Sequence, residues 1–409
     1  MKHSVFGLAV AIVIVGLVAQ AQTAGPPSIP ETGRAALSEF LRARVASGDA
    51  PAIAALVVNR DGVLFEGAAG KRDVAADRAL TTDAIFRIAS MTKPVTSLAV
   101  MMLRDEGKIG LDDPVTKYLP EFGGVRVMTK FNEDGTYESR PPSRPILIRH
   151  LLTHTSGLGY SFADPRLARI DDGKKTTAEM PLLNDPGERF TYGPSTAVLG
   201  RIVEKVSGQT LDVFVTRRIF DPLGMHDTFY VVPPEKVGRV VTGHTRLNGA
   251  LTERPNPAAP RSTVAGDGGL FSDARDYGFF MQMWLNGGRL GGTRLVKEST
   301  VKEMISNQIG RVVVETQAAS GGVISKPFPI GAGKDKFGFG FQIETPPIAD
   351  RGLRSAGSLS WGGINNTHFW IDPQKQVAGV VLMQVLPYYD ERCIDVLRGF
   401  ERLVYQQIR

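Results

Sequence analysis

Apolar residues in the first quarter of the chain follow a helical pattern, then a strand pattern, then a helical pattern again. Residues 33–47 carry Leu37, Phe40 and Leu41 on one stripe, which predicts a helix. Two apolar runs follow, and the turn sequence Asn-Arg-Asp-Gly between them favours a β-hairpin. The expected elements are a helix over 33–47, strands over 52–58, 63–68 and 84–88, and a second helix over 90–105.

The remaining three quarters of the chain divide into a mixed middle region and a C-terminal region where strand patterns return. Helices are expected over 195–206, 211–220, 274–285 and 389–407, and strands over 339–343, 367–371 and 377–383. The glycine-rich stretch 310–336 predicts a surface loop.

Strand patterns at both ends of the chain, with helical patterns between them, predict an α+β fold. We expect an antiparallel sheet that combines N- and C-terminal strands, is flanked by helices, and carries an inserted helical domain. On this interpretation the α/β part spans about 33–111 and 286–409, and the helical insert spans about 112–285.

The N-terminus has the pattern of a secretory signal peptide over residues 1–21. Met1-Lys2-His3 precedes an apolar run over 5–18, and Ala19-Gln20-Ala21 has the small-x-small pattern that signal peptidase cleaves. The alternative is a membrane anchor, but a spanning helix needs roughly 20 apolar residues and this run is shorter. We therefore expect export to the periplasm or the medium, a mature chain over 22–409, and no stable membrane span after cleavage.

Composition excludes several function classes. The 48 basic and 42 acidic residues are interspersed without a compact basic run, so no nucleic-acid partner is expected. The single cysteine, and six histidines without a His-Glu-x-x-His pair, argue against a metal site. Gly-rich segments lack the ending of a phosphate loop, so we expect neither a metal nor an organic cofactor.

Ser90 and Lys93 form the strongest chemical candidate, in the segment Ser-Met-Thr-Lys where a strand pattern ends and a helix pattern begins. A three-residue spacing on a helix puts both side chains on one face, where a desolvated, neutral lysine can take the serine proton. A second Ser-x-x-Lys at Ser299 precedes an amphipathic helix pattern and predicts a helix N-cap. Because Ser90 alone also fits an N-cap, the spacing by itself does not decide its role.

The segments around Ser90 resemble the serine β-lactamase and penicillin-binding-protein superfamily. Five segments match in order along most of the mature chain: Ser90–Lys93, Gly107–Val115 (GKIGLDDPV), Leu151–Leu158 (LLTHTSGL), Pro186–Tyr192 (PGERFTY) and Gly268–Ser272 (GGLFS). The resemblance implies a β-lactamase/transpeptidase-like domain over 22–409 with Ser90 as nucleophile, Lys93 as base and Tyr192 as a proton relay beside them. Taken alone, Tyr192 would be read as a core aromatic, and His154 as a structural hydrogen-bonding partner.

Two motifs depart from the superfamily in the same direction. The second motif ends in Pro194 where a substrate-binding asparagine is usual, and the third has Trp361-Gly362-Gly363 where a cationic Lys or His is followed by Thr-Gly. Without the cation, the site lacks a partner for a substrate carboxylate. These features resemble the family VIII carboxylesterases, the class C β-lactamase-like esterase branch. The resemblance implies an oxyanion hole from the amides of Ser90 and Ile364, with Trp361, Gly362 and Gly363 lining the substrate site. A plain glycine-containing turn between strands is compatible with the same residues.

We therefore expect a serine carboxylesterase that hydrolyses short-acyl esters of small molecules through an acyl-enzyme, with acyl transfer or weak β-lactam hydrolysis as side activities. The nearest alternative is a β-lactamase or D-Ala-D-Ala carboxypeptidase that uses the same serine. A second alternative is a non-catalytic cell-envelope binding protein. The acyl and alcohol groups and the oligomeric state are left open by the sequence.

Overall fold

The computed structural model describes residues 1, 25–319, 323–346 and 354–409. Apart from Met1, the predicted signal peptide lies outside the described residues. Within the described part of the chain, no helix combines the length and apolar character needed to cross a membrane.

A mixed arrangement of helices and strands is observed along the whole described chain. The helices are α1 (Glu31–Ala46), α2 (Thr92–Asp105), α3 (Ile148–Leu152), α4 (Pro165–Ile170), α5 (Ser195–Ser207), α6 (Leu211–Val215), α7 (Asp221–Leu223), α8 (Ala274–Leu285), α9 (Glu298–Met304) and α10 (Glu391–Gln407), with short turns η1 (Ala89–Met91), η2 (Val115–Lys117), η3 (Pro120–Gly124), η4 (Thr216–Phe220) and η5 (Pro234–Arg239). The strands are β1 (Ala52–Asn59), β2 (Val63–Asp73), β3 (Arg78–Ala79), β4 (Phe86–Arg87), β5 (Val127–Phe131), β6 (Tyr137–Arg140), β7 (Gly243–Leu247), β8 (Ala250–Arg254), β9 (Phe271–Ser272), β10 (Arg289–Leu290), β11 (Thr293–Arg294), β12 (Lys336–Phe337), β13 (Gln342–Ile343), β14 (Leu359–Gly363), β15 (Thr367–Asp372), β16 (Val377–Leu382) and β17 (Val385–Leu386).

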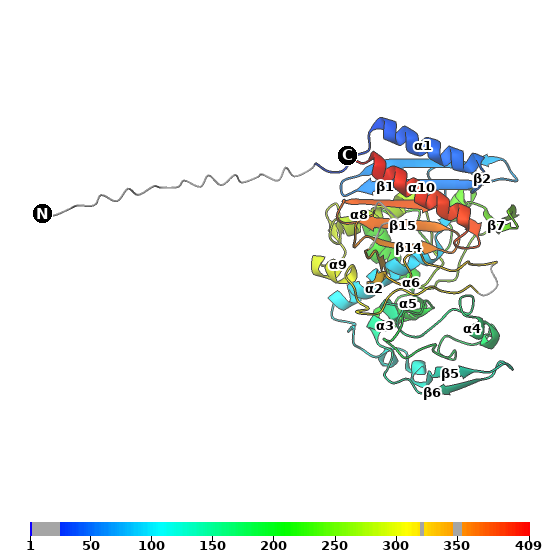
Figure 1. The fold of residues 1–409 in the computed structure, drawn as a ribbon, viewed down its shortest axis with the longest axis vertical. Coiled ribbons are helices and arrows are strands. Elements are labelled where there is room, and N and C mark those ends of the chain that lie inside the picture. The colour runs from blue at the N-terminus through cyan, green and yellow to red at the C-terminus, as the bar shows by residue number, and fades with distance from the viewer. Residues whose placement is uncertain (2–24, 320–322, 347–353) are drawn as a thin grey trace.

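Within the described residues, eight strands form one antiparallel sheet in the order β12-β13-β14-β15-β16-β1-β2-β3. The N-terminal strand β1 pairs with the C-terminal strand β16, with Ala54 opposite Leu382 and Asn59 opposite Val377. Helices α1 and α10 lie over one face of the sheet, while α8 and α2 lie on the other side (Figure 1). The predicted α+β class, with both ends of the chain in one antiparallel sheet, is therefore confirmed.

Strand β1 is apolar at nearly every position because both of its faces are covered. Ile53, Ala55 and Val57 join the cluster under α1 and α10, whereas Ala54 and Leu56 join the large core on the opposite face. A strand buried on two sides reads as a continuous apolar run rather than an alternating one. This is why the sequence signal for β1 was strong.

The hairpin predicted after β1 is present, and β2 extends beyond the predicted end to Asp73. The Asn59 side chain closes the turn by accepting from the amides of Asp61 and Gly62, both at 2.8 Å. Such a side-chain turn is the reason that Asn is favoured at this position.

Several predicted elements differ from the observed ones. The strand expected over 339–343 is limited to β13, because Gly340 has φ +101°, which interrupts the strand. The helix expected over 211–220 is regular only in α6 and continues as the π-helical turn η4. The strand expected over 84–88 is only β4, which pairs with β9 in a separate two-stranded sheet.

The middle region contains more strands than a helical insert would. The hairpin β5–β6 lies at the end of the protein remote from the large sheet (Figure 1). Strands β7 and β8 pair with each other, and β7 also pairs with β17. Helix α8, the last helix of the predicted insert, packs on β1 and β16 and therefore belongs with the sheet.

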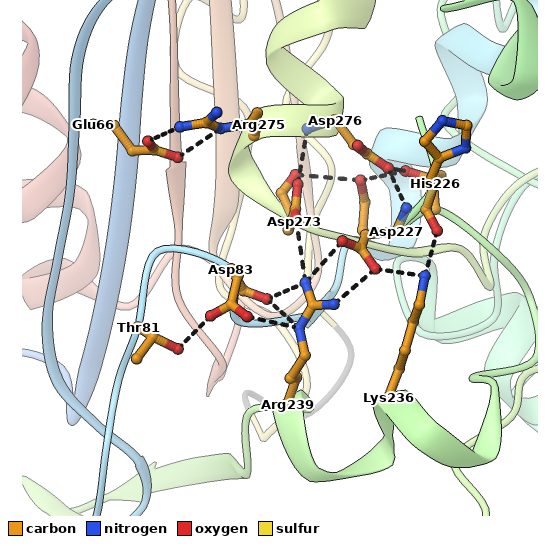
Figure 2. Close-up of polar contacts among 12 residues, drawn as sticks. Glu66, Thr81, Asp83, His226, Asp227, Lys236, Arg239, Asp273, Arg275 and Asp276 are labelled. Atoms are coloured by element: carbon orange, nitrogen blue, oxygen red, sulfur yellow. Dashed lines mark hydrogen bonds and ion pairs between the residues drawn. The ribbon is translucent and has the colours of Figure 1, made fainter. Parts of the chain in front are cut away.

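A polar cluster joins the start of α8 to the segment that leads into β4 (Figure 2). The Arg239 guanidinium contacts the carboxylates of Asp227 at 2.8 Å, Asp83 at 3.1 Å and Asp273 at 3.6 Å. Asp273 caps α8 by accepting from the amide of Asp276 at 2.8 Å. The cluster fixes the strand pair β4–β9, and β4 directly precedes the turn that carries Ser90.

Candidate active site

Ser90 lies in the turn η1, between the end of β4 and the first residue of α2. The preceding Ala89 has φ +45°, a left-handed conformation that is costly for a residue with a Cβ. The turn is held by the amide of Ile88, which donates to the Leu270 carbonyl at 3.0 Å, and by the Tyr277 hydroxyl, which donates to the Met91 carbonyl at 3.1 Å. A strained residue held from both sides is typical of a functional turn.

The alternative role of Ser90 as a helix cap does not match the geometry. Helix α2 has Met91 at its N-cap position, and no side chain caps this helix end. The Ser90 hydroxyl instead contacts Lys93 and Tyr192: Lys93 Nζ lies 3.0 Å from Ser90 Oγ, and Tyr192 OH lies 2.8 Å from the same atom. The structure thus brings together the three side chains that the sequence nominated as nucleophile, base and relay.

The second Ser-x-x-Lys has a different setting, and the prediction that Ser299 caps its helix is wrong. Ser299 is the second residue of α9, whose N-cap position is Lys297. The neighbouring Thr300 is buried and donates to Asp105 at 2.7 Å, because the helix packs with that face inward. Ser299 itself is exposed and Lys302 pairs with Glu298 at 2.8 Å, so this copy has no site around it.

Lys93 is 2% exposed and has two further partners that the sequence did not suggest. Its Nζ lies 2.7 Å from the backbone carbonyl of Asp267 and 3.2 Å from Tyr160 OH. The Tyr160 hydroxyl in turn donates to the Asp267 carboxylate. Lys93 also lies over the ring of Tyr192, 4.8 Å from its centroid. Among the described residues Lys93 has no direct carboxylate partner.

His154 is buried behind the site without contacting Ser90. Its ring centroid lies 5.0 Å from that of Tyr192 and 6.4 Å from that of Trp361. Burial and the nearby Lys93 hold the pKa of His154 well below its usual range, so the imidazole is neutral. Its carbonyl accepts from the amide of Thr191 at 2.7 Å, which fixes the residue beside Tyr192. The role is therefore structural, but the imidazole is not the hydrogen-bonding partner that was expected, because its buried Nδ1 has no hydrogen-bond partner among the described residues.

Trp361, Gly362 and Gly363 lie in strand β14, between β13 and β15, rather than in a turn. The Trp361 ring packs on Tyr192, with centroids 5.1 Å apart, and on Phe337 at 5.5 Å. A Cβ added to Gly363 would lie 2.1 Å from the Ile88 carbonyl oxygen, so the absence of a side chain lets β14 approach the nucleophile turn. Ile364 follows directly, and its amide therefore stays the predicted second oxyanion donor beside the amide of Ser90.

The stretch 310–336, predicted to be a surface loop, also contributes to the site, so that prediction is wrong in part. Gln317 accepts from the Tyr192 amide through its side-chain oxygen at 3.1 Å. The Phe328 ring packs edge-on against Tyr192, with centroids 5.6 Å apart. Val314 and Phe328 are buried because the loop folds back over the core. Glycine content alone had suggested an exposed segment.

A cavity of about 200 Å³ adjoins the catalytic group. Tyr160 and Tyr192 form the wall that it shares with the site, and Phe190 and Leu183 add apolar surface. Its polar lining includes two ion pairs: Arg189–Glu315, and Arg166–Asp164 at 2.7 Å. Tyr160 and Tyr192 thus link this cavity to the catalytic group.

Comparison with known proteins decides the family. The family model described as Beta-lactamase matches residues 37–402. The chain belongs to the Beta-lactamase family. Protein Rv1367c of Mycobacterium tuberculosis is 34% identical over 352 residues, which are 81% of this chain and 85% of that protein. Lovastatin esterase of Penicillium rubens is 30% identical over 348 residues, 80% of this chain and 86% of that protein.

The fold agrees with this assignment. The LovD6 mutant of simvastatin synthase (LovD) from Aspergillus terreus superposes with a TM-score of 0.79 at 26% identity, covering 92% of this chain and 95% of that chain. The serine β-lactamase and penicillin-binding-protein superfamily and its β-lactamase/transpeptidase-like fold, both predicted from the sequence, are therefore confirmed.

The sequence predicted a second motif that ends in Pro194 without a substrate-binding amide, and the structure shows how this segment is arranged. Pro194 occupies the N-cap position of α5 and offers no side-chain hydrogen bond. The next residue, Ser195, is buried and shares a hydrogen bond of 2.8 Å with Ser156. No amide group therefore reaches toward a substrate from this motif.

Proposed function

We propose that this chain is an exported serine carboxylesterase that hydrolyses short-acyl esters through an acyl-enzyme on Ser90. The observation that carries the proposal is the hydroxyl of Ser90, which lies 3.0 Å from Lys93 Nζ and 2.8 Å from Tyr192 OH beside the aromatic wall of Trp361. The name of the relative from Penicillium rubens, an esterase, supports the same reaction class. Trp361 and Pro194 replace the cation and the amide that a β-lactam or peptide substrate would use.

In the first step, Lys93 takes the proton of Ser90 Oγ as this oxygen attacks the ester carbonyl carbon. The carbonyl oxygen becomes an oxyanion that accepts from the amides of Ser90 and Ile364. When the intermediate collapses, the bond to the alcohol oxygen breaks and that oxygen receives a proton from Lys93, relayed by the Tyr192 hydroxyl. The products of this step are the free alcohol and the acyl group on Ser90.

In the second step, water attacks the acyl carbon while Lys93, again neutral, accepts one of its protons. The ester bond to Ser90 Oγ breaks, the serine is reprotonated, and the carboxylic acid leaves. If an alcohol replaces water, the same step makes a new ester. A relative from Aspergillus terreus named monacolin J acid methylbutanoyltransferase, 28% identical over 353 residues, supports acyl transfer as a side activity of the same site.

Hydrolysis of p-nitrophenyl esters from acetate to octanoate, measured beside nitrocefin, tests the proposal. We expect fast turnover of the shorter esters, slow or absent turnover of nitrocefin, and loss of ester turnover in Ser90→Ala. Ser299→Ala is the matched control, because it removes the serine of the other Ser-x-x-Lys. Fast nitrocefin turnover with poor ester turnover would instead identify a β-lactamase.

Covalent labelling separates the enzyme from a non-catalytic cell-envelope binding protein. A fluorophosphonate reacts with an activated serine, so the wild type is expected to label at Ser90 and Ser90→Ala is expected not to label. Export is tested separately by N-terminal sequencing of the periplasmic or secreted protein, whose first residue should lie near position 22.

A further inference from the structure

Two partners of Lys93 other than Ser90, the Asp267 carbonyl and the Tyr160 hydroxyl, indicate how the lysine amine is oriented. Lys93 Nζ contacts the Asp267 carbonyl at 2.7 Å, Tyr160 OH at 3.2 Å and Ser90 Oγ at 3.0 Å. A neutral amine has two hydrogens and one lone pair. If both hydrogens are donated to the first two oxygens, the lone pair is left facing Ser90.

Tyr160 is suited to accept from Lys93 because its own hydrogen is already committed. Its hydroxyl donates to the Asp267 carboxylate, so only lone pairs remain for Lys93. Burial, followed by the nearby Asp267 and Tyr192, raises the pKa of Tyr160 well above its usual value, so the phenol keeps this proton. Asp267 thus acts on Lys93 twice, directly through its carbonyl and indirectly through Tyr160.

Asp267 is held in place by its neighbour Gly266, which passes between α2 and α5. The Thr96 hydroxyl donates to the Gly266 carbonyl at 2.7 Å. A Cβ at Gly266 would lie 2.3 Å from the Thr196 carbonyl oxygen, so only glycine permits this close passage. The Tyr160 ring is fixed on its other side by Phe162, with stacked centroids 4.8 Å apart.

We infer that Tyr160 and Asp267 are positioning residues that orient the lone pair of Lys93 toward Ser90 and balance the charge that Lys93 gains when it takes the serine proton. This inference rests on the proposed function of Ser90 and Lys93. It assigns a role to the Asp267 carboxylate, which is linked to the base through two hydrogen bonds and the Tyr160 hydroxyl. The titratable groups that face Lys93 are Tyr160, Tyr192, Asp267 and the neutral His154.

The test compares Tyr160→Phe and Asp267→Asn with Tyr230→Phe. Tyr230 is the matched control, because its hydroxyl donates to Ala265 at 3.1 Å in the same loop but it does not contact Lys93. We expect Tyr160→Phe to lower kcat by about 10²-fold with KM changed by less than about threefold, because orientation of the base matters in the transition state. Tyr230→Phe should keep kcat within about threefold of the wild type.

A split between kcat and KM separates positioning from a merely structural role. Asp267→Asn keeps the backbone carbonyl that accepts from Lys93 but weakens the partner of the Tyr160 hydroxyl, so kcat should fall with KM changed by less than about threefold. Because Asp267 acts partly through Tyr160, the double variant Tyr160→Phe with Asp267→Asn should lower kcat by less than the product of the two single losses. Melting curves of all variants check folding, and Tyr160→Phe keeps the test decisive if Asp267→Asn does not fold.

Fluorophosphonate labelling distinguishes the two ways in which the idea can fail. If the wild type neither labels nor hydrolyses esters, the proposed function fails and the inference falls with it. If the wild type is active and Ser90→Ala is not, the inference alone is overturned by Tyr160→Phe with wild-type kcat and labelling rate, or by a folded Asp267→Asn with wild-type kcat.

Discussion

Gly363→Ala is the perturbation whose effect follows most directly from the geometry of the site. The new Cβ would lie 2.1 Å from the Ile88 carbonyl oxygen and 2.4 Å from Thr367 Oγ1, whereas real Cβ atoms essentially never approach a heavy atom within 3.0 Å. Strand β14 and the nucleophile turn must therefore separate by roughly 1 Å. A displacement of about 1 Å between catalytic groups can cost about 10²-fold in rate.

We therefore expect kcat/KM of Gly363→Ala on p-nitrophenyl acetate to fall by about 10²-fold. Overpacking of this kind also destabilises by about 1–3 kcal/mol, so the melting temperature should drop by a few degrees. Gly124→Ala is the matched control, because nothing lies within 4 Å of its added Cβ. It should leave both quantities near those of the wild type.

A double variant shows whether the contact with Thr367 or the contact with the Ile88 carbonyl causes the loss of kcat/KM. Thr367→Ala removes the hydroxyl but leaves the Ile88 carbonyl, which is backbone and cannot be removed. Gly363→Ala combined with Thr367→Ala should therefore stay impaired. The reasoning is refuted if Gly363→Ala alone keeps the wild-type kcat/KM and melting temperature.

Three further predictions concern residues outside the catalytic group. Ser299→Ala should keep ester turnover within about twofold of the wild type, and a loss similar to that of Ser90→Ala would show that this second motif had been misjudged. Arg354→Ala should destabilise the fold by about 3 kcal/mol in chemical denaturation, because it leaves the buried Glu401 carboxylate, now 2.6 Å from the guanidinium, without its partner. Burial, then the nearby carboxylates, raise the pKa of Asp273 to about 7, above that of an Asp in the unfolded chain, so the cost of this group to the fold grows as the pH rises from about 4 toward 7 and is fully present above pH 7. Asp273→Asn, which keeps a capping oxygen, should therefore raise the free energy of unfolding at pH 8 by about 1 kcal/mol or more, with a smaller gain at pH 5. Asp164→Asn should instead lower the free energy of unfolding at pH 8. Burial raises the pKa of Asp164, but hydrogen bonds from Arg166 and from backbone amides outweigh it, so the pKa is lowered and the ionised form stabilises the fold. Equal responses of the two caps would contradict this sign.

The part of the site that local patterns could predict is the part carried by short motifs. Ser90 and Lys93 share one helical turn, so their proximity follows from spacing alone, and Tyr192 was placed by resemblance. Strand β1 and the final helix were predicted because burial on defined faces leaves a periodic apolar pattern. These signals need no knowledge of the remaining chain.

Long-range pairing explains what was missed. Tyr160 and Asp267 meet over a hydrogen bond that joins residues 107 positions apart, and neither has a local motif to mark it. No strand was expected at β14, where a glycine-containing turn was one alternative, because Gly362 and Gly363 are poor strand formers. Strands β13 and β15 nevertheless pair with it on both sides. At such positions tertiary contacts determine the secondary structure and the neighbours of a residue, and local propensity carries no information about them.

Two glycines, Gly266 and Gly363, show how the backbone positions the catalytic group. Gly266 allows its segment to approach the backbone of Thr196, and this contact fixes the position of Asp267. Gly363 allows β14 to approach the backbone of Ile88, and this contact fixes the position of β14 relative to Ser90. A side chain at either glycine would leave the nucleophile, base and relay unchanged in sequence while moving their surroundings apart. A relative that keeps the Ser-x-x-Lys motif but not these two close approaches is therefore a poor candidate for the same activity, and the kinetics of Gly363→Ala measure how much of the rate depends on this packing.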